Sequence, residues 1–376
     1  MQVNELVVQS GPSAAKTSGL EGVVVADTRL SQVDGERGEL VIAGSRVDDL
    51  AGHASFEAVA ANLLGEARYP LDGHLPTLLG RARVAAFVRL ADRALGVAAI
   101  NPMSALMALL AGLGDELDVV GVLGAMPVLV AAHARAHAGL SAIAPQAELG
   151  HAADFLSMLG IADTGPRARA LDAYLVTVCD HGLNASTFTA RVVASTASDT
   201  VSSLVAAVGA LKGPLHGGAP GPVLDMLDGA ARAASPRAWL EAELAAGRRI
   251  MGMGHRVYRV RDPRAAVLER AVERLDSELA ANGGHDAERT RGRLAQARNM
   301  ERAAEALLAE RHPERRLRAN VEFYTAILLE AVGIPRELFS AVFAVGRSAG
   351  WLAHVEEQRR TGRLIRPQSR YVGEVA

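Results

Sequence analysis

Hydrophobic and polar positions follow two different patterns along the chain. The only strand-like segments lie between residues 23 and 47, where two apolar runs flank the turn-forming sequence Asp-Gly-Glu-Arg-Gly at residues 34–38. The runs are residues 22–26 and 40–43, and they predict a small β-hairpin near the start of the chain. From Ser55 onward, Ala, Leu, Val and Arg recur at spacings of three and four, which is typical of helices with one buried face. The pattern therefore predicts a mostly α-helical protein.

Prolines divide the helical region into predicted segments. A proline removes a backbone donor and disfavours helix at the residue before it, so we expect a break at each one. The predicted breaks fall at Pro70, Pro102, Pro127, Pro145 and Pro166.

The composition changes in the second half of the chain. From about residue 236 to residue 318, Arg, Glu, Ala and Leu alternate, as in Leu-Glu-Arg-Ala-Val-Glu-Arg-Leu at residues 268–275. Such helices bury a narrow apolar stripe and expose charge to water on their other faces. Gly283 and Gly284 predict a loop between two of them. We expect a smaller, more exposed domain here.

Length, charge and hydropathy limit the class of protein. With 376 residues, 49% hydrophobic and 22% charged, the chain can build a large core and is not generally disordered. A net charge of -2 provides no long-range field for nucleic acid, so no nucleic-acid partner is expected. The longest uncharged apolar stretch, residues 119–132, is too short to span a bilayer, so no membrane partner is expected.

The N-terminal residues and the single cysteine bear on the cellular location of the protein. Residues 1–19 lack the charged and then apolar pattern of a signal peptide, and they predict a short frayed lead. Cys179 is the single cysteine, which excludes an intramolecular disulfide and fits a reducing cytoplasm. We therefore expect a cytoplasmic protein in which Cys179 is a small buried hydrophobe.

Two histidines lie in glycine-rich segments. His216 belongs to Gly-Pro-Leu-His-Gly-Gly-Ala-Pro at residues 213–220, and His255 to Met-Gly-Met-Gly-His-Arg-Val-Tyr at residues 251–258. Glycine lets the backbone approach a ligand closely, so an imidazole held there faces a pocket rather than a packed core. Either segment alone could equally be a turn that contains a histidine.

Further polar segments contribute one more histidine, a carboxylate and three arginines. They are Asp-His-Gly-Leu-Asn-Ala-Ser-Thr at 180–187 with His181, Arg-Asp-Pro-Arg at 261–264 with Arg264, Asn-Val-Glu-Phe-Tyr at 320–324 with Glu322, Ala-Val-Gly-Arg-Ser at 344–348 with Arg347, and Leu-Ile-Arg-Pro at 364–367 with Arg366.

In their order, spacing and residue sequence, these segments resemble those of the citrate synthases, including the related 2-methylcitrate synthases. The similarity extends to Gly-Leu-Glu-Gly-Val-Val at residues 19–24 and Asp-Gly-Glu at 34–36, so it covers nearly the whole chain. It implies an all-α homodimer with a large helical domain, residues 1–217 and 334–376, and a small domain, residues 218–333, that closes over the active site. The implied reaction condenses acetyl-CoA with oxaloacetate to give citrate and CoA, with CoA as a cosubstrate and no metal or permanently bound cofactor.

The resemblance also implies roles for three catalytic residues. Making a carbon nucleophile from a thioester requires a carboxylate base near the methyl group and a donor to the thioester oxygen. Glu322 is the implied base and His216 the implied donor. His255 is implied to polarise the keto oxygen of the second substrate. Closure of the small domain would exclude water from this chemistry.

Substrate binding is implied for a second group of residues. Planar guanidinium groups grip carboxylates through two parallel hydrogen bonds. By match to the family, Arg264, Arg347 and Arg366 hold the carboxylates of oxaloacetate, with Arg366 reaching in from the partner subunit, and His181 orients the substrate.

CoA binding is implied by the same match. Arg259 corresponds to a phosphate-binding arginine, and the backbone from Met251 through Gly252, Met253 and Gly254 would lie along the nucleotide. Because no third glycine and no preceding parallel strand accompany Gly252 and Gly254, the sequence is not a dinucleotide-binding fingerprint.

Three positions depart from the family pattern. Glu322 stands where aspartate is usual, Pro220 where asparagine is common, and Gly182 where an acidic residue commonly follows the histidine. An extra methylene moves the carboxylate by about 1 Å, and such a shift can cost on the order of 10²-fold in rate. Three readings stay open: a citrate synthase with a reshaped site, a 2-methylcitrate synthase that uses propionyl-CoA, and a CoA-binding regulatory paralogue without turnover. Retention of all the histidines and arginines favours an enzyme.

Two other patterns suggest chemistry only superficially. His133 and His137 have a helical spacing compatible with a metal, but no third ligand accompanies them, and we expect a solvent-facing helix. Cys179 and His181 are two residues apart, so on a helix they would face different directions and form no nucleophile and base pair.

Overall fold

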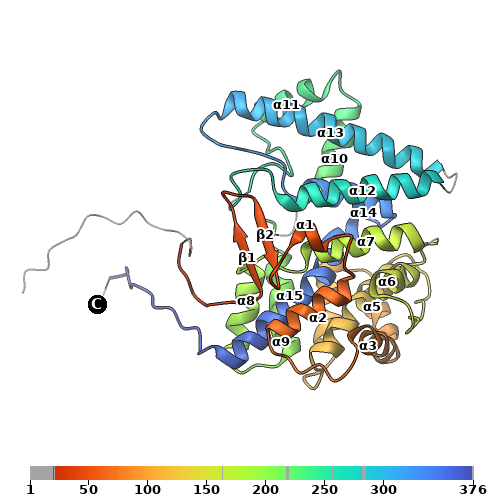
Figure 1. Ribbon diagram of the computed structural model, residues 1–376, viewed down its shortest axis with the longest axis vertical. Helices are drawn as coiled ribbons and strands as arrows, with labels where there is room; N and C mark the ends of the chain where they lie inside the picture. Colours follow the sequence, from red (N-terminus) through yellow and green to blue (C-terminus); the bar gives the residue numbers. More distant parts are fainter. Residues whose placement is uncertain are drawn as a thin grey trace, which may run out of the picture.

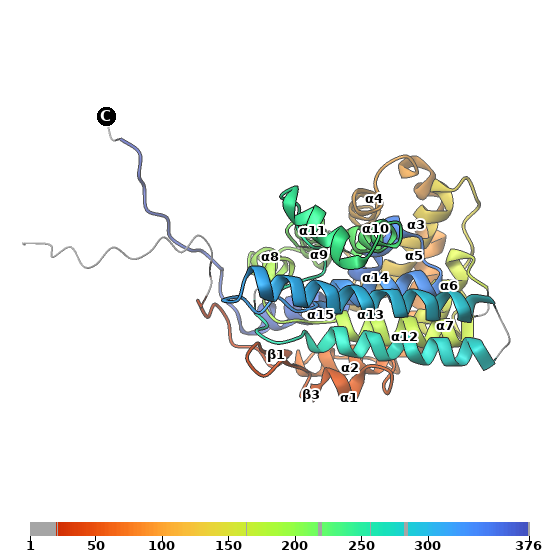
Figure 2. The ribbon, with the colours of Figure 1, turned by 90° about the horizontal axis from the view of Figure 1, so that it is seen from above.

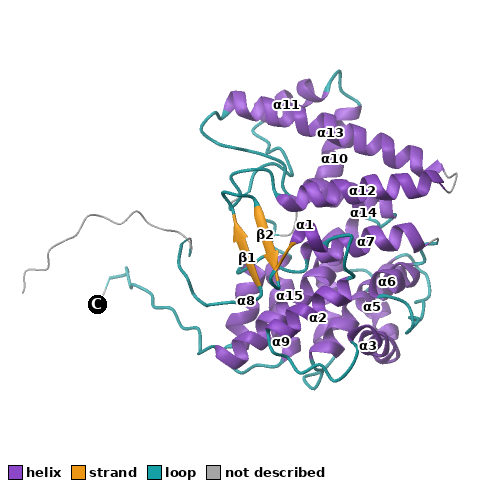
Figure 3. Ribbon diagram, viewed as in Figure 1, coloured by secondary structure: helices purple, strands orange, loops and turns teal. Residues whose placement is uncertain are grey.

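The computed structural model describes residues 20, 22–162, 164–216, 220–255, 257–281 and 285–374, and of residues 164, 220 and 285 it describes the backbone alone. Helices dominate the fold, and one small sheet lies at its side (Figure 3). The prediction of a mostly α-helical protein is confirmed. The predicted lead at residues 1–19 and the predicted loop at Gly283 and Gly284 lie outside the described residues.

The sheet consists of three short antiparallel strands in the order β1, β2, β3. These are β1 (Ser31–Asp34), β2 (Glu39–Ile42) and β3 (Ser45–Arg46). Asp34 pairs with Glu39 across the turn, and Ser31 pairs with Ile42. The predicted turn and second strand are correct, but the predicted strand at residues 22–26 is wrong. A four-residue turn fixes the register, so the partner of β2 is the segment directly before the turn.

Most helices form a large body that surrounds two long buried helices, α5 (Val119–His137) and α15 (Phe339–Thr361). The remaining elements of the body are α1 (Val47–Leu50), α2 (Phe56–Glu66), α3 (Leu75–Leu90), η1 (Ala91–Val97), α4 (Pro102–Ala111), α6 (His151–Leu159), α7 (Thr164–Val178), α8 (Ala185–Ala194), α9 (Thr200–Leu211) and η2 (Arg336–Leu338).

A second group of helices lies together on one side of this body (Figures 1 and 2). It contains α10 (Pro220–Ala231), α11 (Pro236–Ala245), α12 (Pro263–Ala281) and α13 (His285–Arg311). Helix α14 (Val321–Val332) packs against α12 and also against α7 of the body. Helices α11, α12 and α13 of this group lie in the charge-rich segment of the sequence, and α10 precedes it. The predicted domain boundary at residues 217 and 218 falls at residues outside the description, and the other falls at Gly333, a left-handed cap with φ of 94°.

Side-chain caps begin many of the helices. Ser55, Asp118, Asp199 and Asn320 each accept a backbone N–H from the first turn of the helix that follows. Such caps satisfy amides that have no partner within the helix.

The prolines divide the helices less often than predicted. Pro70 and Pro145 lie between helices, and Pro102 and Pro166 lie in the first turns of α4 and α7. Pro127, however, lies inside α5, so the predicted break is wrong there. Helix α5 is packed between α3, α6 and α15, and this burial outweighs the lost hydrogen bond.

Helix α5 continues beyond the uncharged stretch of residues 119–132, through residues 133–137. Among the described residues, two helices are long and apolar enough to cross a membrane by length and composition, residues 119–137 and 336–361. Of their apolar windows, 78% and 94% of the residues are buried inside the protein. Buried helices at the centre of a folded core pass the same test.

Candidate functional site

Three aromatic side chains meet where the body faces the second group of helices. His181 follows the end of α7, while His255 and Tyr258 lie in the segment before α12. The rings of His181 and His255 are edge to face with centroids 5.6 Å apart, and His181 Nε2 shares a hydrogen bond of 3.0 Å with Tyr258 Oη. Burial, with the nearby charges of Arg264 and Arg347, holds the pKa of His181 well below its usual range. His181 is therefore neutral near pH 7.

The segment that carries His255 is tied to the start of α14. Gly252 and Gly254 have φ of 73° and 85°, a left-handed conformation that suits glycine. Met253 pairs with Ala319 in an isolated antiparallel bridge, and Gly254 N donates to Arg318 O at 2.7 Å. Asn320, the cap of α14, donates from Nδ2 to Gly254 O at 2.9 Å. These bonds join the segment that carries His255 to the start of the helix that carries Glu322, although Gly254 and Asn320 lie 66 positions apart in the sequence.

The surroundings of His255 fix its protonation. Its Nδ1 accepts the backbone N–H groups of Val257 at 3.1 Å and Tyr258 at 3.2 Å. Burial lowers the pKa of His255 to about 4, so the ring is neutral near pH 7. A neutral ring whose Nδ1 accepts must carry its hydrogen on Nε2. His255 is thus a neutral Nε2–H donor.

His216 is held through its other ring nitrogen, Nε2. Its Nε2 accepts the backbone N–H of Ser186 at 3.3 Å and lies 2.8 Å from Ser186 Oγ, which accepts Trp351 Nε1–H at 3.1 Å. Burial lowers the pKa of His216 to about 4. The ring is therefore neutral near pH 7. The Ser186 hydroxyl also donates to Asn184 Oδ1 at 2.8 Å, so Nδ1 carries the ring hydrogen only in the tautomer in which Nε2 accepts from Ser186 N–H. Of the segment around His216, residues 217–219 and the side chain of Pro220 lie outside the description.

Glu322 occupies the first turn of α14, where its N–H donates to Asn320 Oδ1 at 3.0 Å. Its Oε2 is buried and has no hydrogen-bond partner among the described residues. Burial raises the pKa of Glu322 to about 7, and the charges of Arg264 and Arg347 act in the opposite direction. A carboxylate with this pKa can accept a proton near neutral pH.

Arg264 is buried and paired within its own segment. Its Nε and Nη2 donate to Asp262 Oδ1 at 3.0 Å and Oδ2 at 2.8 Å. Asp262 Oδ2 also accepts the N–H of Val321 at 3.1 Å, at the start of α14. Asp262, which the sequence analysis did not single out, therefore joins Arg264 to the helix that carries Glu322.

Arg347 comes to the same place from α15. Its Nε donates to Val178 O at 2.5 Å, and its guanidinium lies 4.7 Å from the ring centroid of Phe343. Burial lowers its pKa to about 10, so the side chain remains charged near pH 7. Arg264 and Arg347 both act on the pKa of His181 and of Glu322, which places two buried positive charges around the cluster.

Two of the predicted arginines do not join the cluster. Arg259 is exposed, and its nearest carboxylate is that of Glu36, 4.0 Å away. Arg366 is exposed in the segment after α15, which runs away from the helical body (Figure 1).

The two discounted patterns remain unlike chemical sites, although their surroundings differ from the prediction. His133 is buried rather than solvent-facing, because its Nε2 bonds to Ile100 O at 3.1 Å and satisfies the ring inside the core. Cys179 is buried as predicted, directly after α7. Within the described part of the chain, no group of three or more His, Cys, Asp or Glu side chains is arranged to hold a metal.

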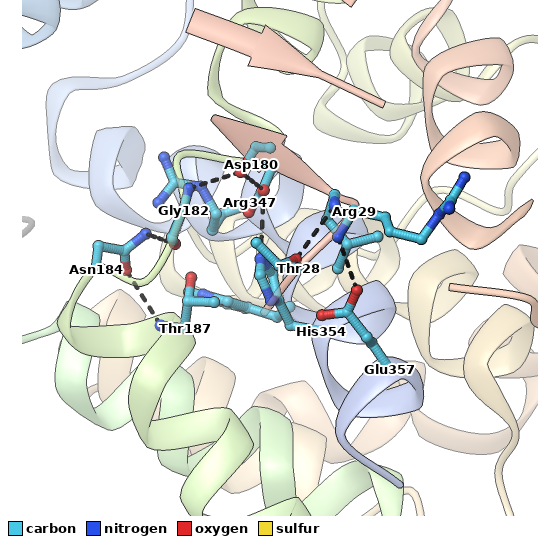
Figure 4. Close-up of polar contacts among 12 residues, drawn as sticks. Thr28, Arg29, Asp180, Gly182, Asn184, Thr187, Arg347, His354 and Glu357 are labelled. Atoms are coloured by element: carbon cyan, nitrogen blue, oxygen red, sulfur yellow. Dashed lines mark hydrogen bonds and ion pairs between the residues drawn. The ribbon is translucent and has the colours of Figure 1, made fainter. Parts of the chain in front are cut away.

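Beneath His181 lies a buried polar network that sequence reasoning missed. Arg191 Nη1 donates to His354 Nδ1 at 2.9 Å and to Glu357 Oε2 at 2.6 Å, and Asp180 Oδ2 lies 3.3 Å from His354 Nε2. Figure 4 shows His354 between Asp180 and Glu357. Because arginine only donates, His354 carries its hydrogen on Nε2 and donates it to Asp180. His354 and Glu357, three residues apart on one face of α15, were the available signal.

Comparisons with known proteins agree on one family. Residues 19–368 match the family described as citrate synthase, C-terminal domain. The chain is 38% identical to the citrate synthase of Haloferax volcanii over 380 residues, which cover 95% of each protein. It is 47% identical over 204 residues to putative citrate synthase 2 of Mycobacterium tuberculosis, which corresponds to 54% of this chain and 51% of that relative.

Solved structures give the same result. The chain is similar to a ternary complex of carboxymethyl coenzyme A and oxaloacetate with citrate synthase from Thermoplasma acidophilum, with a TM-score of 0.82 and 27% identity. The similarity covers 96% of both chains. It confirms the predicted fold class, which combines many helices with a small sheet.

Proposed function

This chain belongs to the citrate synthase family, and we propose that His216, His255 and Glu322 perform the condensation of acetyl-CoA with oxaloacetate to give citrate and CoA. The observation that carries the proposal is that His216 and His255 are both neutral and that each is held inside the chain through one ring nitrogen. This arrangement leaves the other ring nitrogen of each histidine to meet a substrate oxygen.

The first step makes the carbon nucleophile. Glu322 Oε2, buried and without a partner, takes a proton from the methyl carbon of acetyl-CoA. His216 Nδ1–H donates to the thioester oxygen as negative charge develops there. A neutral donor held in a buried site stabilises this charge through its hydrogen bond.

The second step joins the two substrates. The enolate carbon attacks the keto carbon of oxaloacetate, and His255 gives its Nε2 proton to the keto oxygen, which becomes the hydroxyl of the product. The proton held by Glu322 then returns to His255, so both residues regain their starting states. Water then cleaves the thioester and releases CoA. Arg264 and Arg347, the buried cations of the cluster, hold the oxaloacetate carboxylates, and His181 orients the substrate beside His255.

The remaining assignments concern residues outside the buried cluster. We assign Arg366 to the oxaloacetate site of a partner subunit in a cytoplasmic homodimer, since in its own chain it lies away from the cluster. Arg259 and the backbone of Gly252, Met253 and Gly254 are assigned to CoA. Closure of the small domain, residues 218–333, would bring them over the substrates. A CoA analogue bound to the Thermoplasma acidophilum relative supports a CoA site in this fold.

The test mixes purified protein with oxaloacetate and either acetyl-CoA or propionyl-CoA and follows the free thiol of CoA. We expect release with acetyl-CoA. Faster release with propionyl-CoA would instead identify a 2-methylcitrate synthase, and no release with either thioester from folded dimer would identify a paralogue without turnover. Glu322→Gln is the matched variant, because it keeps the shape and removes the base. It should abolish turnover and leave oxaloacetate binding in calorimetry nearly unchanged.

A further inference from the structure

One hydroxyl group holds both neighbours of His181. Ser31 Oγ, at the first residue of β1, donates a short hydrogen bond to Asp180 Oδ2 and accepts the N–H of Gly182 at 2.9 Å. Asp180 and Gly182 are the residues on either side of His181. The backbone that carries this histidine is therefore bound on both sides to the sheet.

The far side of this contact is rigid. Asp180 Oδ2 also accepts His354 Nε2–H from the buried α15 at 3.3 Å. The chain just before β1 is bound to the same helix, because Arg29 N donates to Glu357 Oε1 at 3.0 Å (Figure 4). Ser31 thus lies between two points that are fixed in the core.

The other end of the hairpin touches the segment that follows His255. Gly35, in the turn after β1, accepts the N–H of Arg259 on its carbonyl oxygen at 2.9 Å. A Cβ atom added at Gly35 would lie 2.2 Å from Val257 O, which real contacts essentially never allow. The glycine is required there by the close approach of Val257, whose N–H donates to the His255 ring.

A paired strand joins these two contacts. All four residues of β1 pair with β2, from Ser31 with Ile42 to Asp34 with Glu39. Leu40 and Ile42 of β2 are buried in the core. Antiparallel pairing over a buried face leaves the strand little freedom to bend or slip.

We infer that the β1–β2 hairpin sets the position of His181 relative to His255, with Ser31 and Gly35 as its positioning residues. The inference rests on the proposed function, because it concerns two histidines of the same site. The hairpin contacts the His181 turn at its base and the His255 segment at its tip. A displacement of about 1 Å at reacting groups can cost on the order of 10²-fold in rate, so a short rigid connection between the two matters for turnover.

The first test removes the hydroxyl at the base. Ser31→Ala is compared with Gln32→Ala, a matched control, since Gln32 is the next residue of β1 and is exposed on the opposite face. We expect Ser31→Ala to raise the KM for oxaloacetate about tenfold and to leave the KM for acetyl-CoA within about twofold. Ser31→Thr, which keeps the hydroxyl, should restore the parent value.

The second test separates the tip from the base. Gly35→Ala should lower kcat on the order of 10²-fold by displacing the His255 segment. Gly65→Ala is the control, because a Cβ there meets nothing within 4 Å. Amide hydrogen exchange of residues 180–184 and 255–262 is measured in all variants, including the parent. The exchange rate should increase at residues 180–184 in Ser31→Ala and at residues 255–262 in Gly35→Ala.

The outcomes distinguish this inference from the proposed function. If the parent releases CoA but Ser31→Ala behaves like Gln32→Ala, or if both KM values change equally, the hairpin has no positioning role. If the parent releases no CoA, the proposed function fails and hydrogen exchange decides alone. Unchanged exchange in both segments would then overturn the inference, and the expected local increases would support it.

Discussion

The four arginines assigned to substrate binding form two contrasting pairs. The buried pair, Arg264 and Arg347, is 3% and 1% exposed, and each guanidinium is already bonded inside the chain. The exposed pair, Arg259 and Arg366, lies at the surface, and the side chain of Arg259 is 59% exposed. A single chain thus preorganises the part of the site that we assign to oxaloacetate. The parts around CoA and the last carboxylate need a second element, which we assign to domain closure and to a partner subunit.

The largest effect should follow from breaking the buried pair. Arg264→Gln leaves the carboxylate of Asp262 buried without its cation, and removing one partner of a buried ion pair costs about 3–5 kcal/mol of stability. Urea denaturation measures this loss. The double variant Arg264→Gln with Asp262→Asn should recover most of the stability and no oxaloacetate binding. Recovery of binding in the double variant would show that Arg264 serves the fold alone.

A change at Arg366 should reduce turnover without affecting the stability of the subunit. Arg366→Ala removes one carboxylate contact and should lower kcat/KM on the order of 10²-fold. The assignment to a partner subunit is tested by mixing this variant with Glu322→Gln and refolding the two together. In a symmetric dimer with shared sites, random pairing restores about a quarter of the parent turnover. If the mixture stays inactive, each Arg366 serves its own chain or none.

The pH dependence tests how the buried pair acts on Glu322, whose pKa is about 7 in the folded protein. The base must be ionised, so kcat/KM should fall about tenfold per pH unit below 7. His216 and His255, with pKa values of about 4, add no further limb between pH 5 and 7. Steady-state rates from pH 5 to 9 measure this, and a single limb near pH 4 would remove Glu322 as the base.

The stability of the protein should change with pH in the opposite sense. The folded pKa of Glu322 is raised above its ordinary value of 4.5. Its contribution to stability is therefore fully present below about pH 4.5 and is lost as the pH rises through about 7. Glu322→Gln should unfold at a higher urea concentration than the parent at pH 8, and the two should be similar at pH 4.5.

The smallest effect is expected at the other member of the exposed pair. Arg259→Ala should raise the KM for acetyl-CoA about three- to tenfold and leave the KM for oxaloacetate unchanged, because a single exposed charge contributes little. The effect should shrink as salt is added. Arg270→Ala, at another exposed arginine that pairs with Asp48, is the control. An equal change in both variants would assign the effect to net charge.

The sequence predicted those features that local spacing determines. The period of apolar residues predicted the helices, and the glycines around His255 predicted a backbone that the structure holds at positive φ. The burial of Pro127 in α5 and the burial of His133 depend on partners far along the chain. The buried network links Asp180 and Arg191, which are eleven positions apart, to His354, which lies more than 150 residues further along the chain. No short pattern reports such contacts.

The bond between Arg29 N and Glu357 Oε1 spans 328 residues of sequence. A ribosome would therefore have to release nearly the whole chain before the His181 turn could acquire its support. Until then, the hairpin near the start of the chain would lack the helix that anchors it. Contacts of such long range slow folding, because the chain must close a large loop before it gains their energy. Catalytic competence would thus appear only after synthesis, and a truncated product would carry every histidine of the site without its anchoring helix.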